Sequence, residues 1–151
     1  MLLYYVKTKY WRTSCIYNFG FVERDIWIKK IATTIPSGKT VLDVGAGTAP
    51  YKNLFKHCIY KTHDFAKLNK EQNKAGKNYC QLDYISNIDN IPVEDKSFDV
   101  IICTEVLEHV PEPIKAIKEF ARIIKPQGMI ILSAPLAGFV HQEPYHFYGG
   151  L

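Results

Sequence analysis

Several features that would point to a metal, a membrane or a nucleic acid are missing from this 151-residue sequence. Its four cysteines, Cys15, Cys58, Cys80 and Cys103, include no C-x-x-C pair and show no metal-ligand spacing. Three of them lie in or beside apolar runs, where a thiol behaves as a small buried hydrophobe. This cysteine usage indicates a reducing compartment, and we expect a cytoplasmic protein.

Long apolar runs and dense charge are absent as well. The opening segment Met1–Tyr10 is too short for a secretory signal, and no run approaches the length of a membrane span, so we expect no membrane partner. The net charge of +4 comes from 19 basic and 15 acidic residues spread along the chain. A nucleic-acid-binding face usually shows a denser basic stripe, so the charge pattern argues against a nucleic-acid partner.

What the sequence does contain is an alternation of apolar strands and helical patterns. Short apolar runs predict strands at Thr40–Val44, Ile59–His63, Tyr79–Leu82, Phe98–Cys103 and Met129–Leu132. Helical spacing and Pro or Gly boundaries predict helices at Glu23–Thr34, Pro50–His57 and Pro113–Ile124, with a short polar helix or loop at Lys67–Lys74. This order predicts an α/β fold, a Rossmann-like parallel sheet of about five strands with helices on both faces.

A glycine-rich bend follows the first predicted strand, in the run Val41–Tyr51. Gly45 and Gly47 allow a tight turn and close approach of a ligand, because they carry no Cβ. Asp43 ends the strand, where its carboxylate can accept a hydrogen bond from an ammonium group. A dinucleotide fingerprint needs a third small residue where Pro50 stands. The loop also lacks Lys and Arg, so it suits a cation better than a pyrophosphate.

Two more acids follow the next predicted strands. Asp64 lies about twenty residues after the glycine bend, where an acid can grip a ribose diol, although it could also cap the next segment. Asp83 follows the third predicted strand and can accept a hydrogen bond from an exocyclic amine. Phe65 or Ile85 would cover the ring of such a base.

These blocks resemble the class I S-adenosylmethionine-dependent methyltransferases. The run Val41–Tyr51 looks like motif I of that family, and Ile91–Val110 resembles the fourth-strand region of its small-molecule "type 11" branch. Pro126–Gly128 matches the usual Pro-Gly-Gly with Gln127 as one departure, and the resemblance covers about Ile31 to Ala134. It implies S-adenosyl-L-methionine as cofactor. Carried over by position, the cofactor-binding residues are Asp43, Gly45, Ala46, Gly47, Asp64, Phe65, Asp83, Tyr84 and Thr104.

The resemblance divides the chain into an N-terminal lead and helix (1–34), a cofactor-binding domain (35–134) and the start of an acceptor-pocket segment (135–151). Methyl transfer to a hydroxyl needs a general base, and the candidates are His109, His141 and His146. Glu105, Glu108 and His109 resemble the metal-binding trio of some O-methyltransferases. The alternative, which we favour, is that Glu108 and His109 only order the turn and that no metal is bound.

Related domains continue with two more strands beside the fifth, so we expect a truncated chain that lacks the usual C-terminal strands. Met129–Leu132 would then be an exposed apolar edge through which copies can self-associate, unless a partner chain or the N-terminal lead covers it. The leading functional hypothesis is methyl transfer to a small-molecule or glycan-type acceptor. The alternatives are a non-catalytic module that binds S-adenosylmethionine or S-adenosylhomocysteine, or an inactive fragment, and a nicotinamide-dependent oxidoreductase, which Pro50 disfavours.

Overall fold

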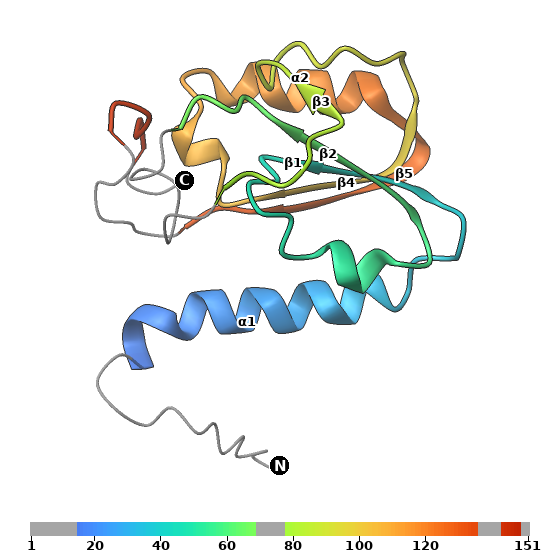
Figure 1. Cartoon of the computed structure of the whole chain (residues 1–151), viewed down its shortest axis with the longest axis horizontal. Coiled ribbons are helices and arrows are strands. Elements are labelled where there is room, and N and C mark those ends of the chain that lie inside the picture. The colour runs from blue at the N-terminus through green and yellow to red at the C-terminus, as the bar shows by residue number, and fades with distance from the viewer. Residues whose placement is uncertain (1–14, 69–77, 136–142, 149–151) are drawn as a thin grey trace.

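The strands and helices alternate along the chain in the computed structural model, which describes residues 15–68, 78–135 and 143–148 (Figure 1). The helices are α1 (Cys15–Ala32) and α2 (Pro113–Ile123), with 3-10 turns η1 (Lys52–Phe55) and η3 (Leu107–His109). The strands are β1 (Thr40–Val44), β2 (Ile59–Asp64), β3 (Tyr84–Ile85), β4 (Phe98–Thr104) and β5 (Ile124–Ser133).

All described strands form one parallel sheet in the order β3-β2-β1-β4-β5. The chain order reverses between β1 and β4, so the carboxyl ends of these two strands flank a topological switch point, where open sheets of this type bind ligands. Asp43 pairs in register with Thr62 on one side and Ile102 on the other. The predicted α/β fold with a parallel sheet is confirmed.

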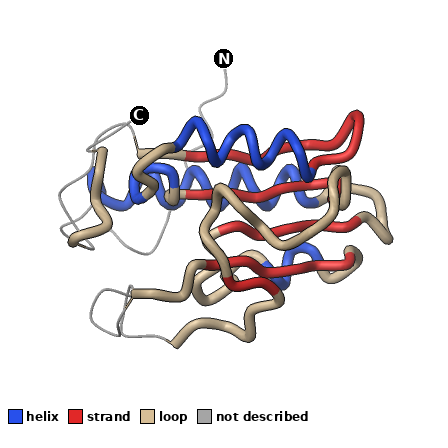
Figure 2. Tube along the Cα trace, turned by 90° about the horizontal axis from the view of Figure 1, so that it is seen from above, coloured by secondary structure: helices blue, strands red, loops and turns tan. Residues whose placement is uncertain are grey.

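Each face of the sheet is covered by a helical layer. Figure 1 shows α1 and η1 on one face and α2 on the other, and Figure 2 shows the strands lying side by side. Alternate β1 residues serve the two layers: Val41 packs with Ile28 and Phe55 of the α1 side, whereas Leu42 packs with Phe120 of the α2 side. The continuous apolar run of β4 follows from this two-sided burial.

Two element predictions are wrong. The third strand lies at Tyr84–Ile85, not at Tyr79–Leu82, and pairs with β2 at only two positions. A strand of two residues has no periodicity for a sequence pattern to detect. The segment predicted as the helix Pro50–His57 forms only the 3-10 turn η1. Lys67–Lys74 extends beyond the described residues.

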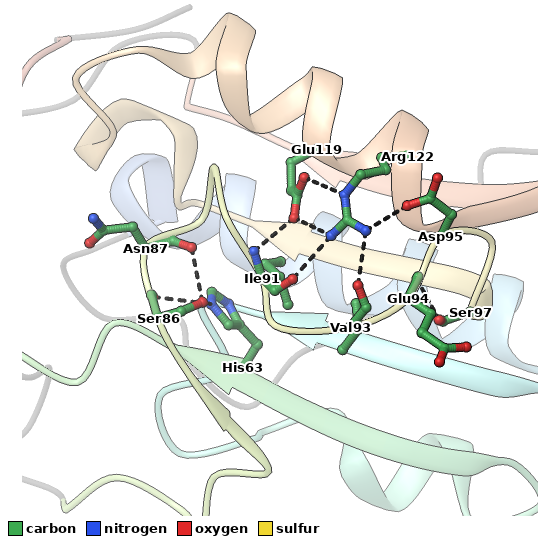
Figure 3. Close-up of polar contacts among 10 residues, drawn as sticks. All are labelled: His63, Ser86, Asn87, Ile91, Val93, Glu94, Asp95, Ser97, Glu119 and Arg122. Atoms are coloured by element: carbon green, nitrogen blue, oxygen red, sulfur yellow. Dashed lines mark hydrogen bonds and ion pairs between the residues drawn. The ribbon is translucent and has the colours of Figure 1, made fainter.

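A polar clamp holds the long connection between β3 and β4 against α2 (Figure 3). Arg122 donates to the carbonyls of Ile91 and Val93 at 3.0 and 2.9 Å, and it pairs with Asp95 and Glu119 at 2.8 and 2.6 Å. Glu119 in turn accepts from the Ile91 N–H at 2.7 Å. The clamp satisfies backbone groups that have no ladder partner, and so it fixes the loop that leads out of β3.

Strand β5 forms one edge of the sheet. Within the described residues no strand pairs with its outer side. Met129, Ile130 and Leu132 are 44, 39 and 37% exposed, which confirms the expected apolar surface at this edge. None of the described helices has the length and apolar character needed to cross a membrane.

Candidate functional site

A cavity of about 570 Å³ opens at the carboxyl ends of β1, β2, β3 and β4. Most of the predicted cofactor-binding residues line it, namely Asp43, Gly45, Ala46, Gly47, Asp64, Phe65 and Thr104. Because parallel strands end at the same edge of the sheet, residues far apart in the sequence converge here.

The floor of the cavity is the bend after β1. Gly45 and Gly47 have φ of 71° and 51°, in the left-handed region that favours glycine. The N–H groups of Gly45 and Ala46 donate to the His63 carbonyl at 2.9 and 3.0 Å. A Cβ on Gly45 would lie 2.4 Å from a methyl group of Val106, so the two walls approach as closely as they do only because this residue is glycine.

Two buried carboxylates lie beside the bend. Asp43 is 3% exposed and accepts a short hydrogen bond from the Tyr60 hydroxyl. Burial raises the pKa of Asp43 to about 7, a rise that the Tyr60 hydrogen bond opposes and the neighbouring Asp64 reinforces. Asp64 accepts from the N–H groups of Gly47 and Ala66, each at 3.0 Å, although burial still raises its pKa.

The opposite wall comes from the end of β4 and from α1. Glu105 has a φ of 54°, and its carboxylate accepts from the Ser133 hydroxyl at 2.8 Å. Arg24 of α1 lines the cavity and approaches Glu105 at 3.9 Å. Arg24 was not predicted from the sequence, because a single basic residue on a helix carries no motif. Only the packing of α1 under the sheet brings it to the site.

Residues 143–148 form a strap over the cavity. The Tyr145 carbonyl lies 2.6 Å from His109 Nδ1, and the N–H groups of Phe147 and Tyr148 donate to the Glu108 carbonyl at 3.0 and 3.2 Å. Tyr145 meets Phe65 edge to face, with ring centroids 5.2 Å apart. The strap therefore gives the cavity an aromatic wall that includes the exposed Phe147.

The three histidines predicted as candidate bases differ in their position relative to the cavity. His109 lines the cavity, and the His146 ring lies 5.9 Å from the His109 ring. His141 lies outside the described residues. Because a carbonyl can only accept, the Tyr145 contact requires the proton on His109 Nδ1 and makes Nε2 the basic nitrogen of the neutral ring. That nitrogen lies 3.7 Å from Glu108 Oε1.

Asp83 and Tyr84, which were predicted to bind the cofactor, are not among the residues that line the cavity. The Asp83 carboxylate pairs with Lys61 at 2.8 Å and accepts from the Thr62 N–H at 2.9 Å. Tyr84 packs edge-on against Phe98. Both residues stand at the start of the true β3, and the residues at its carboxyl end that line the cavity are Asn87, Ile88 and Asp89.

The trio considered for a metal does not converge. Glu105 turns toward Ser133 and Arg24, whereas Glu108 is buried beside His109. Across residues 15–68, 78–135 and 143–148 no group of three or more His, Cys, Asp or Glu side chains is arranged to hold an ion.

Comparison with known proteins matches residues 21–150 to the family described as a methyltransferase domain. The ubiquinone biosynthesis O-methyltransferase of Coxiella burnetii is 36% identical over 123 residues, which cover 75% of this chain and 47% of that protein. The demethylmenaquinone methyltransferase of Staphylococcus epidermidis is 27% identical over 135 residues, covering 83% of this chain and 55% of that protein.

Among solved structures, the YcgJ protein of Bacillus subtilis superposes with a TM-score of 0.60 at 26% identity, over 78% of this chain and 52% of that one. The chain thus spans about half the length of the curated relatives that it matches.

Proposed function

This chain belongs to the class I S-adenosylmethionine-dependent methyltransferases, and from that premise we propose that it binds S-adenosyl-L-methionine in the cavity and directs its methyl group to a small-molecule acceptor. The family and fold imply this cofactor. The observation that carries the proposal is the pair of buried carboxylates, Asp43 and Asp64, beside a glycine bend at the switch point of the sheet.

The residues present fit this cofactor. A cationic ligand matches Asp43, because burial without an opposite charge raises the pKa of this carboxyl. A bound cation would stabilise its charged form. A ribose diol matches Asp64 at the end of β2. Glycine at position 45 keeps the floor open for close approach of the ligand. The apolar side chains Phe65 and Ile88 supply walls for a flat base.

In the proposed arrangement each of these side chains binds and orients. The bound cofactor supplies an electrophilic methyl group on a sulfonium. Asp43 holds the ammonium end, Arg24 is a lining cation that suits the carboxylate end, and Asp64 holds the ribose. Asn87, at the carboxyl end of β3, takes the role of adenine partner that the sequence had suggested for Asp83. Such fixed orientation is the main contribution that an enzyme makes when the donor is already reactive.

The acceptor would enter beneath the strap. Tyr145, Phe147 and Val110 form apolar walls there, and His109 is the nearest candidate for a base. An apolar, partly aromatic pocket suits a small molecule with a ring better than a glycan. The names of the relatives, which refer to ubiquinone and demethylmenaquinone, support a small-molecule acceptor for this chain also.

A binding module without catalysis is the second candidate. It is favoured by the surroundings of the His109 ring, whose Nδ1 donates to the Tyr145 carbonyl and whose Nε2 lies 3.7 Å from Glu108 Oε1. In this case the chain binds the cofactor and transfers nothing.

Thermal melting with S-adenosylhomocysteine and with NAD tests the binding half of the proposal. We expect S-adenosylhomocysteine at one hundred times its dissociation constant to stabilise the fold by about 2.7 kcal/mol, and NAD to have no effect. Stabilisation by NAD alone would refute the proposal. Transfer of radiolabelled methyl groups to small molecules of a cell extract would then separate an enzyme from a binding module.

A further inference from the structure

We propose that Tyr60 is a positioning residue for the cofactor: from behind the cavity wall, its hydroxyl orients the Asp43 carboxylate and favours its charged form. The inference rests on the proposed function, because it takes Asp43 to meet a cationic group in the cavity. Tyr60 itself is not among the residues that line the cavity, whereas Asp43 is. Tyr60 therefore acts on the site indirectly, and its hydrogen bond to Asp43 is the contact that joins it to a residue of the cavity wall.

The fold places the two side chains on the same face of the sheet. Tyr60 pairs in register with Val41, and Asp43 follows two residues later on β1, so both project toward the α1 layer. The Tyr60 ring packs against the fully buried Phe55, with centroids 5.8 Å apart. This packing fixes the direction of the hydroxyl, which donates to Asp43 Oδ2.

The hydrogen bond gives the two oxygens of the Asp43 carboxylate different roles. Within the described residues, the Tyr60 hydroxyl is the hydrogen-bond donor to Asp43, and it uses Oδ2. Oδ1 then remains for a ligand cation. A carboxylate held at one oxygen loses less rotational freedom on binding than one that turns freely, so preorganisation adds to affinity.

The charge of Asp43 also depends on this contact. Burial raises its pKa to about 7, and the Tyr60 hydrogen bond keeps it from rising further. The other ionisable groups around Asp43 are Asp64 on β2, Cys103 on β4, Cys80 before β3, and Arg24 and Tyr51 at the cavity wall. Burial raises the pKa of both thiols and that of Tyr51, so these groups stay neutral near pH 7.

The test is the pH dependence of S-adenosylhomocysteine binding, measured by calorimetry on the natural chain and on Tyr60→Phe. For the natural chain, affinity should rise with pH as Asp43 ionises and level off above about pH 7. Tyr60→Phe should bind roughly tenfold more weakly near pH 7, since a hydrogen bond to a charged group is lost, and should level off at a higher pH.

Matched variants separate this effect from a loss of stability. Thr40→Val removes another hydroxyl bonded to a carboxylate, that of Asp99 at 2.7 Å, at the opposite end of β1. It should lower the melting temperature without moving the pH profile. In an Asp43→Asn background, Tyr60→Phe should no longer move the profile, because the titrating group is gone.

A stronger hydrogen-bond donor at position 60 should shift the pH dependence of binding in the opposite direction. Replacing Tyr60 with 3-fluorotyrosine makes the hydroxyl more acidic at almost unchanged size, so binding should level off at a lower pH. This substitution also serves if Tyr60→Phe does not fold. If the natural chain binds but both Tyr60 substitutions leave its pH profile unchanged, the inference is wrong. If the natural chain fails to bind S-adenosylhomocysteine at any pH, the proposed function is what fails.

Discussion

At the scale of single residues, Asp43 is a binding group that lowers the stability of the fold. Its carboxyl is 3% exposed, and no cation of the described residues forms an ion pair with it. An acid whose folded pKa lies above its unfolded value destabilises the fold as pH rises between the two, because the unfolded chain releases the proton first. For Asp43 this window runs from 3.8 to about 7.

Asp43→Asn should therefore stabilise the protein and impair its binding. Above pH 7 the buried charge is removed, and we expect a gain on the order of 2–4 kcal/mol in the free energy of unfolding. Near pH 4 the gain should vanish, because Asp43 is then protonated in the native fold. Urea denaturation at both pH values checks this, and an equal effect at both would contradict it. S-adenosylhomocysteine binding should weaken in the same variant.

The contrast between Asp64 and Asp83 gives a second prediction at this scale. Asp64→Ala should weaken S-adenosylhomocysteine binding by about 1–3 kcal/mol, the cost of leaving buried polar groups without partners. The loss includes its support of the Gly47 N–H in the bend. Asp83→Ala should leave binding unchanged, because Asp83 serves Lys61 and Thr62 outside the cavity. Calorimetry on the two variants decides, and weaker binding by Asp83→Ala would restore it to the site.

A site residue can be predicted from the sequence when the residues that mark it stand close together in the chain. Gly45 and Asp43 were identified because a bend and an acid stand together in one short run. Arg24 and Tyr60 were not, because strand register and helix packing bring them to Asp43 and its cavity from distant positions. No pattern in their own neighbourhood marks them.

At the scale of elements, His109 joins the strap to η3, and this attachment competes with a role as base. His109→Asn can keep an N–H for the Tyr145 carbonyl but has no basic nitrogen, whereas His109→Ala has neither. If His109 is the base, both variants should lose about 10²–10⁴-fold in methyl transfer. If it only holds the strap, the Asn variant should keep most of the activity and the Ala variant should not. Steady-state assays with an acceptor found by the radiolabelled transfer experiment discriminate the two roles.

The third strand is the element whose position could not be predicted from the sequence. The strand predicted at Phe98–Cys103 agrees with β4, which ends at Thr104, because two-sided burial forces such a run to be largely apolar. β3 has only two ladder residues, and the clamp of Arg122 and Glu119 holds the loop after it. Its two residues are too few to mark a strand, and the strand predicted at Tyr79–Leu82 is what placed Asp83 at a strand end in the predicted site.

At the scale of the whole molecule, we expect the edge strand β5 to govern association. Its apolar residues Met129, Ile130 and Leu132 are partly exposed, and an exposed apolar edge is a template for pairing with another chain. Natural edges are protected by charged side chains, Lys above all. None of the residues from Met129 to Ser133 carries a charge. We therefore expect copies of this chain to associate through β5.

Ile130→Lys should shift the protein toward monomer in sedimentation velocity experiments over a range of concentrations. The side chain is 39% exposed, so the free energy of unfolding should change by no more than about 1 kcal/mol. Ile114→Lys adds the same charge on α2, at a residue 68% exposed and away from the edge, and it should leave association largely intact. Equal dissociation by both variants would indicate general charge repulsion, and a monomeric natural chain would show that this edge does not drive association. The interface is assigned to β5 only if Ile130→Lys dissociates the protein and Ile114→Lys does not. In that case the charge acts at the edge strand, where it opposes pairing with a second copy.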